Sequence, residues 1–266
     1  MKKAKVFRPT AFAFPYLAVT LVFVIVPLIL VTVYAFRGQD GSFTFENFKY
    51  VFTEAAYRNS LFKTVGIAAL ATLLCLLVAY PVAYVLASAP FNKMAVLALL
   101  FVIPMWMNFV LRIVALKSVF TAIGLKPSFL TGVLGLVYDF LPYMLLPIYT
   151  VLSNMDKSYI EASRDLGASD FSTFWKVTFP LSFPGIISGI SMVFMPIFSA
   201  YAVTGLLADP GTTVIGRGIE ILFGLREYGA GSALSFILLL LVFLVMFLSS
   251  LLSKRTNKTA KGGNRQ

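Results

Sequence analysis

One carboxylate in this sequence, Asp139, lies inside a long apolar run that begins near Phe129. At a rise of about 1.5 Å per residue, a helix over this run places Asp139 about 15 Å deep, near the middle of a bilayer. A carboxylate at that depth costs about 2.5–3.5 kcal/mol and therefore needs a partner or a watery path. Asp139 can neutralise an ammonium group of a passing cation, or it can pair with Arg112, and the sequence leaves both roles open.

Aromatic side chains in apolar segments can assist such a site, because aromatic faces attract ammonium groups by about 0.5–2 kcal/mol. The candidates are Trp106, Tyr138, Tyr143 and Tyr201. Trp106 lies between Pro104 and Asn108, where a broken helix can line a cavity. We predict that Asp139 and these rings line a substrate path, with core packing or lipid contact as the alternative role of each ring.

A chain without histidine has few routes to enzymatic chemistry. Histidine is the usual zinc ligand and proton shuttle, and the sequence contains none. The single cysteine, Cys75, lies in an apolar run, so there is neither an internal disulfide nor a cysteine cluster for a metal. No Gly-x-x-x-x-Gly-Lys-Ser/Thr run is present to cradle a nucleotide. We therefore predict no catalytic residue, no metal site and no cofactor bound by this chain.

Long apolar segments must position these residues. Of the 266 residues, 59% are hydrophobic and 12% are charged, against roughly a quarter charged in a soluble domain. Runs of about 20 apolar residues are long enough to cross a bilayer, and we place them at about 11–36, 61–87, 94–111, 129–152, 181–207 and 233–252. We predict an all-α integral membrane protein with six transmembrane helices in one domain, residues 1–253. A short interfacial helix is expected over residues 112–124, with Arg112 and Lys117 reaching the headgroups.

Basic residues predict the orientation of these spans. They concentrate before the first span, in the short loop after the second, in segment 156–180 and after the last span. Cytoplasmic segments carry an excess of Lys and Arg, so both termini and segment 156–180 are predicted to be cytoplasmic. Residues 254–266 are too polar to pack and are predicted to form a disordered cytoplasmic tail. Membrane topology thus explains the net charge of +11, and we predict contact with the lipid bilayer but not with nucleic acid.

Segment 156–180 is a polar interruption with strong helix signals. Ser158 and Glu161 have the spacing of a capping box, which predicts a helix that begins there. Glycine adopts the left-handed conformation without a steric penalty, so this helix is expected to stop at Gly167.

A second short helix is expected after this glycine. Ser169 or Asp170 can cap it, and it is predicted to run to about residue 177 before Pro180 opens the next apolar run. One face of this helix is apolar and requires a partner, either the chain's own helices or another protein. Its residues are Phe171, Phe174, Trp175 and Thr178.

The resulting hairpin resembles a loop of type I ABC-importer permeases. Their pattern Glu-Ala-Ala…Gly…Ile-x-Leu-Pro is similar to Glu161-Ala162-Ser163, then Gly167, then Val177-Thr178-Phe179-Pro180, with the same spacing. The departures are Ser163, Val177 and Phe179. The resemblance implies that the hairpin forms coupling helices, which sit in a cleft of an ATPase subunit. The residues to which it assigns this ATPase-coupling role are Ser158, Glu161, Ala162, Ser163, Gly167 and Pro180.

The resemblance extends over most of the chain. Residues 103–112, 136–147 and 165–169 look most like the spermidine/putrescine permeases, specifically the first of their two permease subunits. It implies a second homologous permease, an ATPase dimer that uses ATP and Mg, and an extracytoplasmic polyamine-binding protein, in a bacterial cytoplasmic membrane. The alternatives are a permease of the same fold for an amino acid, a metal or an oxyanion, and a motor-independent cation carrier.

Overall fold

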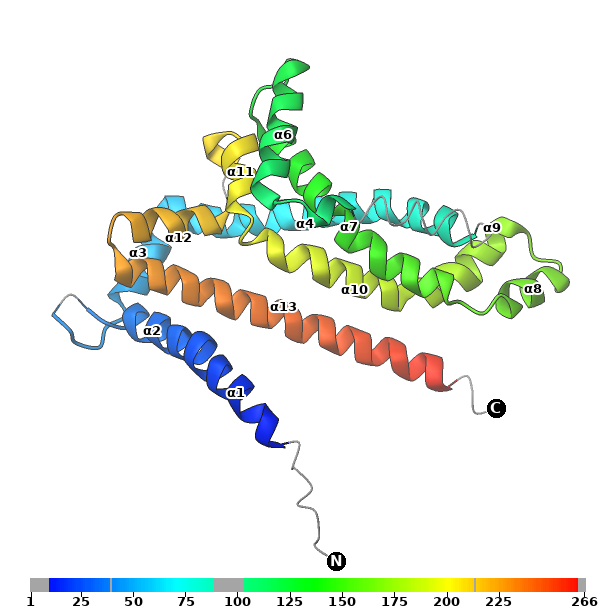
Figure 1. Ribbon diagram of the computed structural model, residues 1–266, viewed down its shortest axis with the longest axis horizontal. Coiled ribbons are helices and arrows are strands. Elements are labelled where there is room, and N and C mark those ends of the chain that lie inside the picture. The colour runs from blue at the N-terminus through cyan, green and yellow to red at the C-terminus, as the bar shows by residue number, and fades with distance from the viewer. Residues whose placement is uncertain (1–9, 39, 89–102, 213, 263–266) are drawn as a thin grey trace, which may run out of the picture. The chain divides into compact units, whose positions relative to one another are not determined.

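The computed structural model describes residues 10–38, 40–88, 103–212 and 214–262 (Figure 1). Regular structure in these stretches is helical, apart from an isolated antiparallel bridge between Arg37 and Phe43. The described helices that are long and apolar enough to cross a bilayer are Pro15–Ala35, Ala55–Ser88, Phe129–Ser153, Asp170–Ile197 and Tyr228–Phe247. The predicted all-α membrane fold is therefore confirmed, while the first half of the predicted third span, 94–111, lies outside the described residues.

The chain divides into two compact units. One comprises residues 1–58 and 219–239, and the other comprises residues 59–218 and 240–266. The single domain expected over residues 1–253 stays a prediction.

The first unit is organised around the end of its first span. This span comprises α1 (Thr10–Thr20), a π-helical turn (Leu21–Ile25) and α2 (Val26–Ala35), and α3 (Glu46–Thr53) follows it. The amide nitrogen of Asn47 donates to the carbonyls of Ala35 and Arg37, at 3.1 and 3.0 Å, and so satisfies carbonyls that the end of α2 leaves free. The ring of Phe36 packs against those of Phe43, Phe45, Phe48 and Phe236.

The core of the second unit is the contact between α7 (Phe129–Ser153) and α10 (Phe179–Ile197), which lie side by side in Figure 1. Two glycines of α10 make this contact close. A Cβ atom on Gly185 would lie 2.8 Å from the Pro147 carbonyl oxygen, and one on Gly189 would lie 2.6 Å from the Met144 sulfur. The small-residue spacing of these glycines predicts such packing between membrane helices.

The second unit contains further helices. They are α4 (Ala55–Ser88), α6 (Phe109–Ala122), α8 (Ser158–Asp165), α9 (Asp170–Thr173) and α11 (Tyr201–Leu207). The chain also contains α12 (Ile215–Gly224) and α13 (Tyr228–Gly262).

The predicted fifth span, 181–207, is wrong at both ends. The helix begins at Asp170, because a π-turn at Phe174–Thr178 joins α9 to α10 without a break. The π-turn shifts the register of the helical backbone hydrogen bonds just before Pro180. Proline has no N–H to donate and would otherwise interrupt these bonds at this position. The helix ends at Ile197, and residues 201–207 form the separate α11, which packs on α6 and α7.

Two further expectations need correction. The side chain of Arg112 is buried in α6 and does not reach outward to headgroups, because it is paired with Asp139. The tail expected to be disordered from Lys254 onward continues α13 as far as Gly262. Residues 254–261 contain neither proline nor glycine, so nothing in them stops a helix.

Candidate functional site

The first arm of the polar hairpin begins with a cap that differs from the predicted one. The Oδ1 atom of Asp156 accepts the backbone N–H of Ser158 at 2.9 Å, and α8 begins there with Lys157 as its cap residue. The predicted capping box between Ser158 and Glu161 is therefore wrong, because Asp156 already provides the acceptor. This backbone hydrogen bond, with a second from the Ser158 side chain, lowers the pKa of the Asp156 carboxyl below its usual value.

The turn of the hairpin is built on Gly167, as predicted. Its φ is +80°, in the left-handed region, and α8 ends at Asp165. The Gly167 N–H donates to the Arg164 carbonyl at 2.8 Å, and the Ala168 N–H donates to the Ser163 carbonyl at 3.1 Å. These two bonds form a Schellman motif, which fixes the direction in which the chain leaves α8.

Side chains hold the two arms together. The hydroxyls of Ser163 and Thr173 lie 2.9 Å apart, and the Arg164 guanidinium binds Asp170 at 3.0 Å. The ion pair is exposed and contributes little, whereas the hydroxyl pair is partly buried. Ser163 is one of the departures from the family motif, and its hydroxyl makes a bond that alanine cannot make.

The second arm is fixed to the membrane spans. The Phe174 ring packs edge-on against Tyr80 and Tyr84 of α4, at centroid distances of 5.9 and 5.3 Å. The Tyr80 hydroxyl lies 3.0 Å from the Ser182 hydroxyl of α10, and Thr178 is buried beside them. Because Asp170–Ile197 is one continuous helix, this arm is connected to α4 through these contacts and to α7 through the glycine contact.

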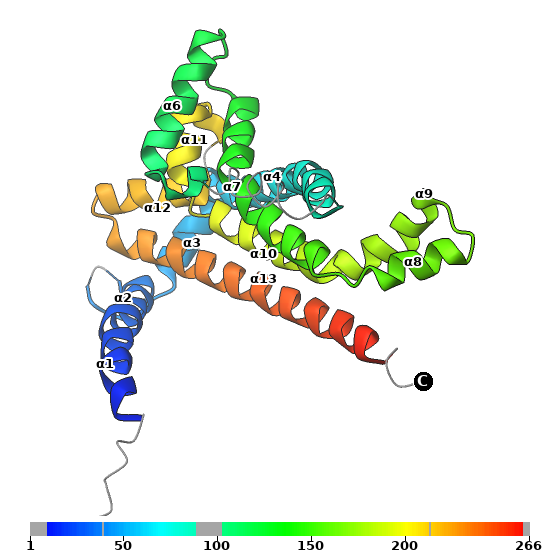
Figure 2. The ribbon, with the colours of Figure 1, turned by 45° about the vertical axis from the view of Figure 1, so that its right-hand side comes forward.

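The hairpin presents apolar side chains that the described chain leaves exposed. Figure 2 shows α8 and α9 beyond the end of α10. The most exposed large side chains there are Tyr159, Leu166, Phe171 and Trp175, with Leu166 at 89%. The predicted apolar face is thus divided, since Phe174 and Thr178 pack inward while Phe171 and Trp175 remain exposed. We call the four exposed residues the hairpin surface.

The residues predicted to couple to an ATPase share this location. All but Ser163, which is half-buried, are exposed: Ser158, Glu161, Ala162, Gly167 and Pro180. A cavity of about 340 Å³ lies between the hairpin and the ends of α4 and α7, and Tyr84, Ser153, Glu161 and Arg164 are among its lining residues. The coupling role itself stays a prediction.

Asp139 is paired with Arg112. The Nη2 atom of Arg112 donates to Asp139 Oδ1, and the two side chains are 5% and 4% exposed. Of the predicted aromatic partners, Trp106, Tyr138 and Tyr201 are exposed, and Tyr143 packs against Phe140. No tyrosine hydroxyl binds the Asp139 carboxylate within the described ranges. The structure therefore contains the ion-pair alternative, and the substrate path stays a prediction.

The opposite end of α4 carries polar contacts that the sequence did not predict. Lys63 donates to the Gly211 carbonyl at 2.9 Å, and the Ile215 N–H donates to the Thr64 hydroxyl at 2.8 Å. The hydroxyl of Thr212 donates to Asp209, which lowers the pKa of that carboxyl. These bonds fix the turn between α11 and α12 on the beginning of α4.

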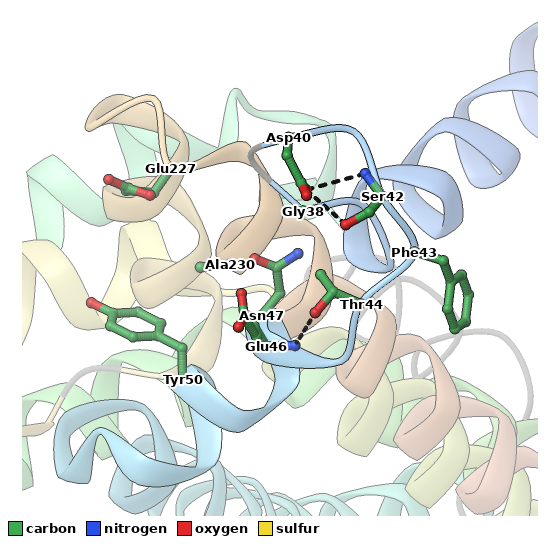
Figure 3. Close-up of a pocket in the computed structure, with 10 residues that line it drawn as sticks. All are labelled: Gly38, Asp40, Ser42, Phe43, Thr44, Glu46, Asn47, Tyr50, Glu227 and Ala230. Atoms are coloured by element: carbon green, nitrogen blue, oxygen red, sulfur yellow. Dashed lines mark hydrogen bonds between the residues drawn. The ribbon is translucent and has the colours of Figure 1, made fainter.

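The first unit has a polar cavity of about 560 Å³ between the loop after α2, α3 and the start of α13 (Figure 3). Its acidic lining residues are Asp40, Glu46 and Glu227, which the sequence places in loops outside the spans. Asp40 accepts the Ser42 hydroxyl at 2.7 Å, and this bond lowers the pKa of the Asp40 carboxyl. Nothing in the sequence joined these acids into one cavity, because Glu227 lies far along the chain.

Comparisons with known proteins identify relatives over nearly the whole length. The family described as "Binding-protein-dependent transport system inner membrane component" matches residues 10–258. The chain is 31% identical to the spermidine/putrescine transport system permease protein PotB of Haemophilus influenzae, over 89% of this chain and 91% of that protein. It is 30% identical to PotB of Escherichia coli, over 89% of this chain and 94% of that protein.

Solved structures show the same fold at low identity. A chain of a bacterial alginate ABC transporter, solved with a periplasmic protein bound to alginate pentasaccharide, superposes with a TM-score of 0.74 at 14% identity and covers 92% of this chain and 93% of that one. A chain of the MetNI methionine ABC transporter, in an inward-facing conformation, gives a TM-score of 0.62 at 14% identity, with coverage of 79% and 98%.

Proposed function

The chain belongs to the family of binding-protein-dependent transport system inner membrane components, and from this premise we propose that it is a permease subunit of an ATP-driven polyamine importer. The resemblance to type I ABC-importer permeases is thereby confirmed. The observation that carries the proposed substrate is the likeness to spermidine/putrescine permeases across 89% of the chain. The proposed partners are a second permease, an ATPase dimer and an extracytoplasmic polyamine-binding protein, with both termini on the cytoplasmic side.

The proposed contact with the ATPase is the hairpin surface, Tyr159, Leu166, Phe171 and Trp175. Exposed apolar side chains on a soluble loop favour a protein partner, because their burial removes apolar area from water. Glu161 and Ser158 lie exposed on the same hairpin and supply polar contacts at the rim. Gly167 fixes the bend, so that both arms enter the partner's cleft in one orientation.

The proposed mechanism is alternating access. The partner ATPase binds ATP with Mg and supplies the free energy, while this chain converts closure of the ATPase dimer into movement of its spans. The hairpin moves with the ATPase, and helix Asp170–Ile197 carries that displacement past the membrane surface. Close packing of Gly185 and Gly189 on α7 obliges α7 to follow, because packed interfaces transmit shifts and do not absorb them.

Uptake of labelled spermidine tests the proposal in cells that lack this chain and in cells to which it has been restored. We expect uptake only with the chain present, with competition by putrescine and no competition by amino acids. Uptake should persist when the membrane potential is collapsed while ATP remains. Spermidine uptake that is identical with and without the chain would remove the polyamine assignment.

A charge reversal on the hairpin tests the coupling step. Glu161→Lys should abolish uptake without reducing the amount of protein in the membrane. Glu54→Lys makes the same change at an exposed residue outside the hairpin and is the matched control. Equal uptake by the two variants would contradict a coupling role for Glu161.

A further inference from the structure

The ion pair of Arg112 and Asp139 is a buried charged feature that the coupling step leaves unused. Arg112 lies in the first turn of α6, directly after the Asn108 cap, and Asp139 lies about ten residues into α7. The two residues are 5% and 3% exposed. In the described part of the chain, Asp139 is the one acidic residue among the buried side chains. A charge so placed is costly in a membrane protein unless it is paired or lines a path.

The pair neutralises charge, but it engages the guanidinium through a single nitrogen. Nη2 of Arg112 binds the carboxylate, whereas the buried Nε and Nη1 atoms have no hydrogen-bond acceptor in the described part of the chain. An arginine that serves as a permanent partner commonly binds a carboxylate at two points through its planar fork. Buried donors without acceptors are unfavourable. This one-point pair is therefore easier to break than a two-point pair.

We propose that Arg112 is the resting counter-ion of Asp139, and that an ammonium group of the transported cation replaces it during transport. The inference rests on the proposed function, because it requires a cationic substrate. An ammonium group carries the same charge as the guanidinium and presents three N–H donors to the carboxylate. Exchange of one cation for the other keeps Asp139 compensated at every stage, whereas separation of the pair alone would leave both charges buried and unpaired. The exchange requires the released Arg112 guanidinium to turn toward water or headgroups, which a long side chain in the first turn of α6 can reach.

The exchange predicts opposite effects for the two partners of the pair. Equilibrium binding of labelled spermidine is measured on the complete transporter in nanodiscs, that is, this chain with its partner permease and ATPase subunits. Arg112→Gln removes the competing cation and should lower the Kd at least fivefold. Asp139→Asn removes the site and should raise the Kd at least tenfold. In the Asp139→Asn background, Arg112→Gln should change the Kd less than twofold, because there is no carboxylate left to contest.

Controls separate cation exchange from a purely structural role, in which the Arg112–Asp139 pair only clamps α6 to α7. Lys117→Gln removes another basic charge of α6 and should leave the Kd within twofold of the wild type. Should Arg112→Gln fail to insert, Arg112→Lys replaces it: lysine lacks the planar fork and pairs more weakly, so the Kd should fall at least twofold. A clamp predicts that the Arg112 and Asp139 variants weaken binding alike or leave the Kd unchanged, and either result overturns the exchange.

The same experiment distinguishes failure of the cation exchange from failure of the proposed polyamine function. A wild-type transporter that binds spermidine while the variants show no opposite shifts contradicts the exchange and leaves the polyamine function standing. A wild-type transporter that binds neither spermidine nor putrescine contradicts both.

Discussion

The close contact between α7 and α10 predicts how much stability the chain loses when Gly185 is replaced by alanine. An alanine Cβ at this position would lie 2.8 Å from the Pro147 carbonyl oxygen and 3.1 Å from both the Ile148 Cα and a Val151 methyl. Ordinary contacts of this kind lie at about 3.5–4.0 Å, so α10 must move away from α7 by about 0.5–1 Å. Two of the three atoms belong to the backbone and cannot rotate away. We expect Gly185→Ala to destabilise the chain by about 1–3 kcal/mol, the usual range for overpacking.

Thermal unfolding of the purified transporter complex measures this effect. Gly66→Ala is the matched control, because a Cβ at Gly66 has no atom within 4 Å. Alanine is a better helix former than glycine, so Gly66→Ala should leave the Tm unchanged or raise it by a few degrees. Gly185→Ala should lower the Tm by several degrees and reduce uptake per inserted molecule. Equal Tm values for the two variants would refute the argument that this contact holds the spans together.

Three further predictions concern the hairpin. Ser163→Ala and Thr173→Ala each remove the hydrogen bond between the arms, which is worth about 0.5–1.5 kcal/mol. Hydrogen exchange of the hairpin amides should show that the double variant destabilises the hairpin no more than either single variant does. Gly167→Ala places a side chain on a residue at φ +80°, which costs about 1–2 kcal/mol, and it should lower uptake per ATP hydrolysed. The matched control is Gly124→Ala, at φ +79° with open space around it, which carries similar strain and should leave uptake per ATP hydrolysed unchanged. The Asp156 carboxyl, which accepts the Ser158 N–H at the start of α8, has a lowered pKa. The stabilisation that this bond gives is therefore present above the unfolded value of about 3.9 and is lost as the pH falls through the folded pKa. Hairpin exchange rates of the wild type and Asp156→Ala should therefore differ at pH 7 and converge in acid, and a difference that persists in acid would contradict the charged cap.

Sequence patterns predicted the features that depend on local chemistry. Apolar runs located the first, second, fourth and sixth spans, because hydropathy is summed over about 20 residues and tolerates errors at the ends. Gly167 located the turn, since the left-handed residue that ends a helix is usually glycine. The spacing of Gly185 and Gly189 predicted a close helix contact, although it did not say that α7 is the partner.

The wrong predictions have a common cause: two sequence signals for a helix start or stop compete at neighbouring residues, and only the structure shows which one prevails. Ser158 has the sequence of a cap, but Asp156 is two residues earlier and its carboxylate is the stronger acceptor. Pro180 signals a helix start, but the π-turn before it removes the conflict with the hydrogen-bond ladder. The sequence left open whether Asp139 pairs with Arg112, because the pairing depends on how α6 packs on α7, which no spacing in the sequence specifies.

Reconstituted transport is the direct test of ATP-driven polyamine import through this chain. The complete transporter is placed in proteoliposomes with the loaded binding protein on one side and ATP with Mg on the other, and the membrane potential is collapsed. We predict accumulation of labelled spermidine against its gradient, only with hydrolysable ATP, and no accumulation with Glu161→Lys. Spermidine entry without ATP that follows an imposed membrane potential would contradict the account and would indicate a motor-independent cation carrier.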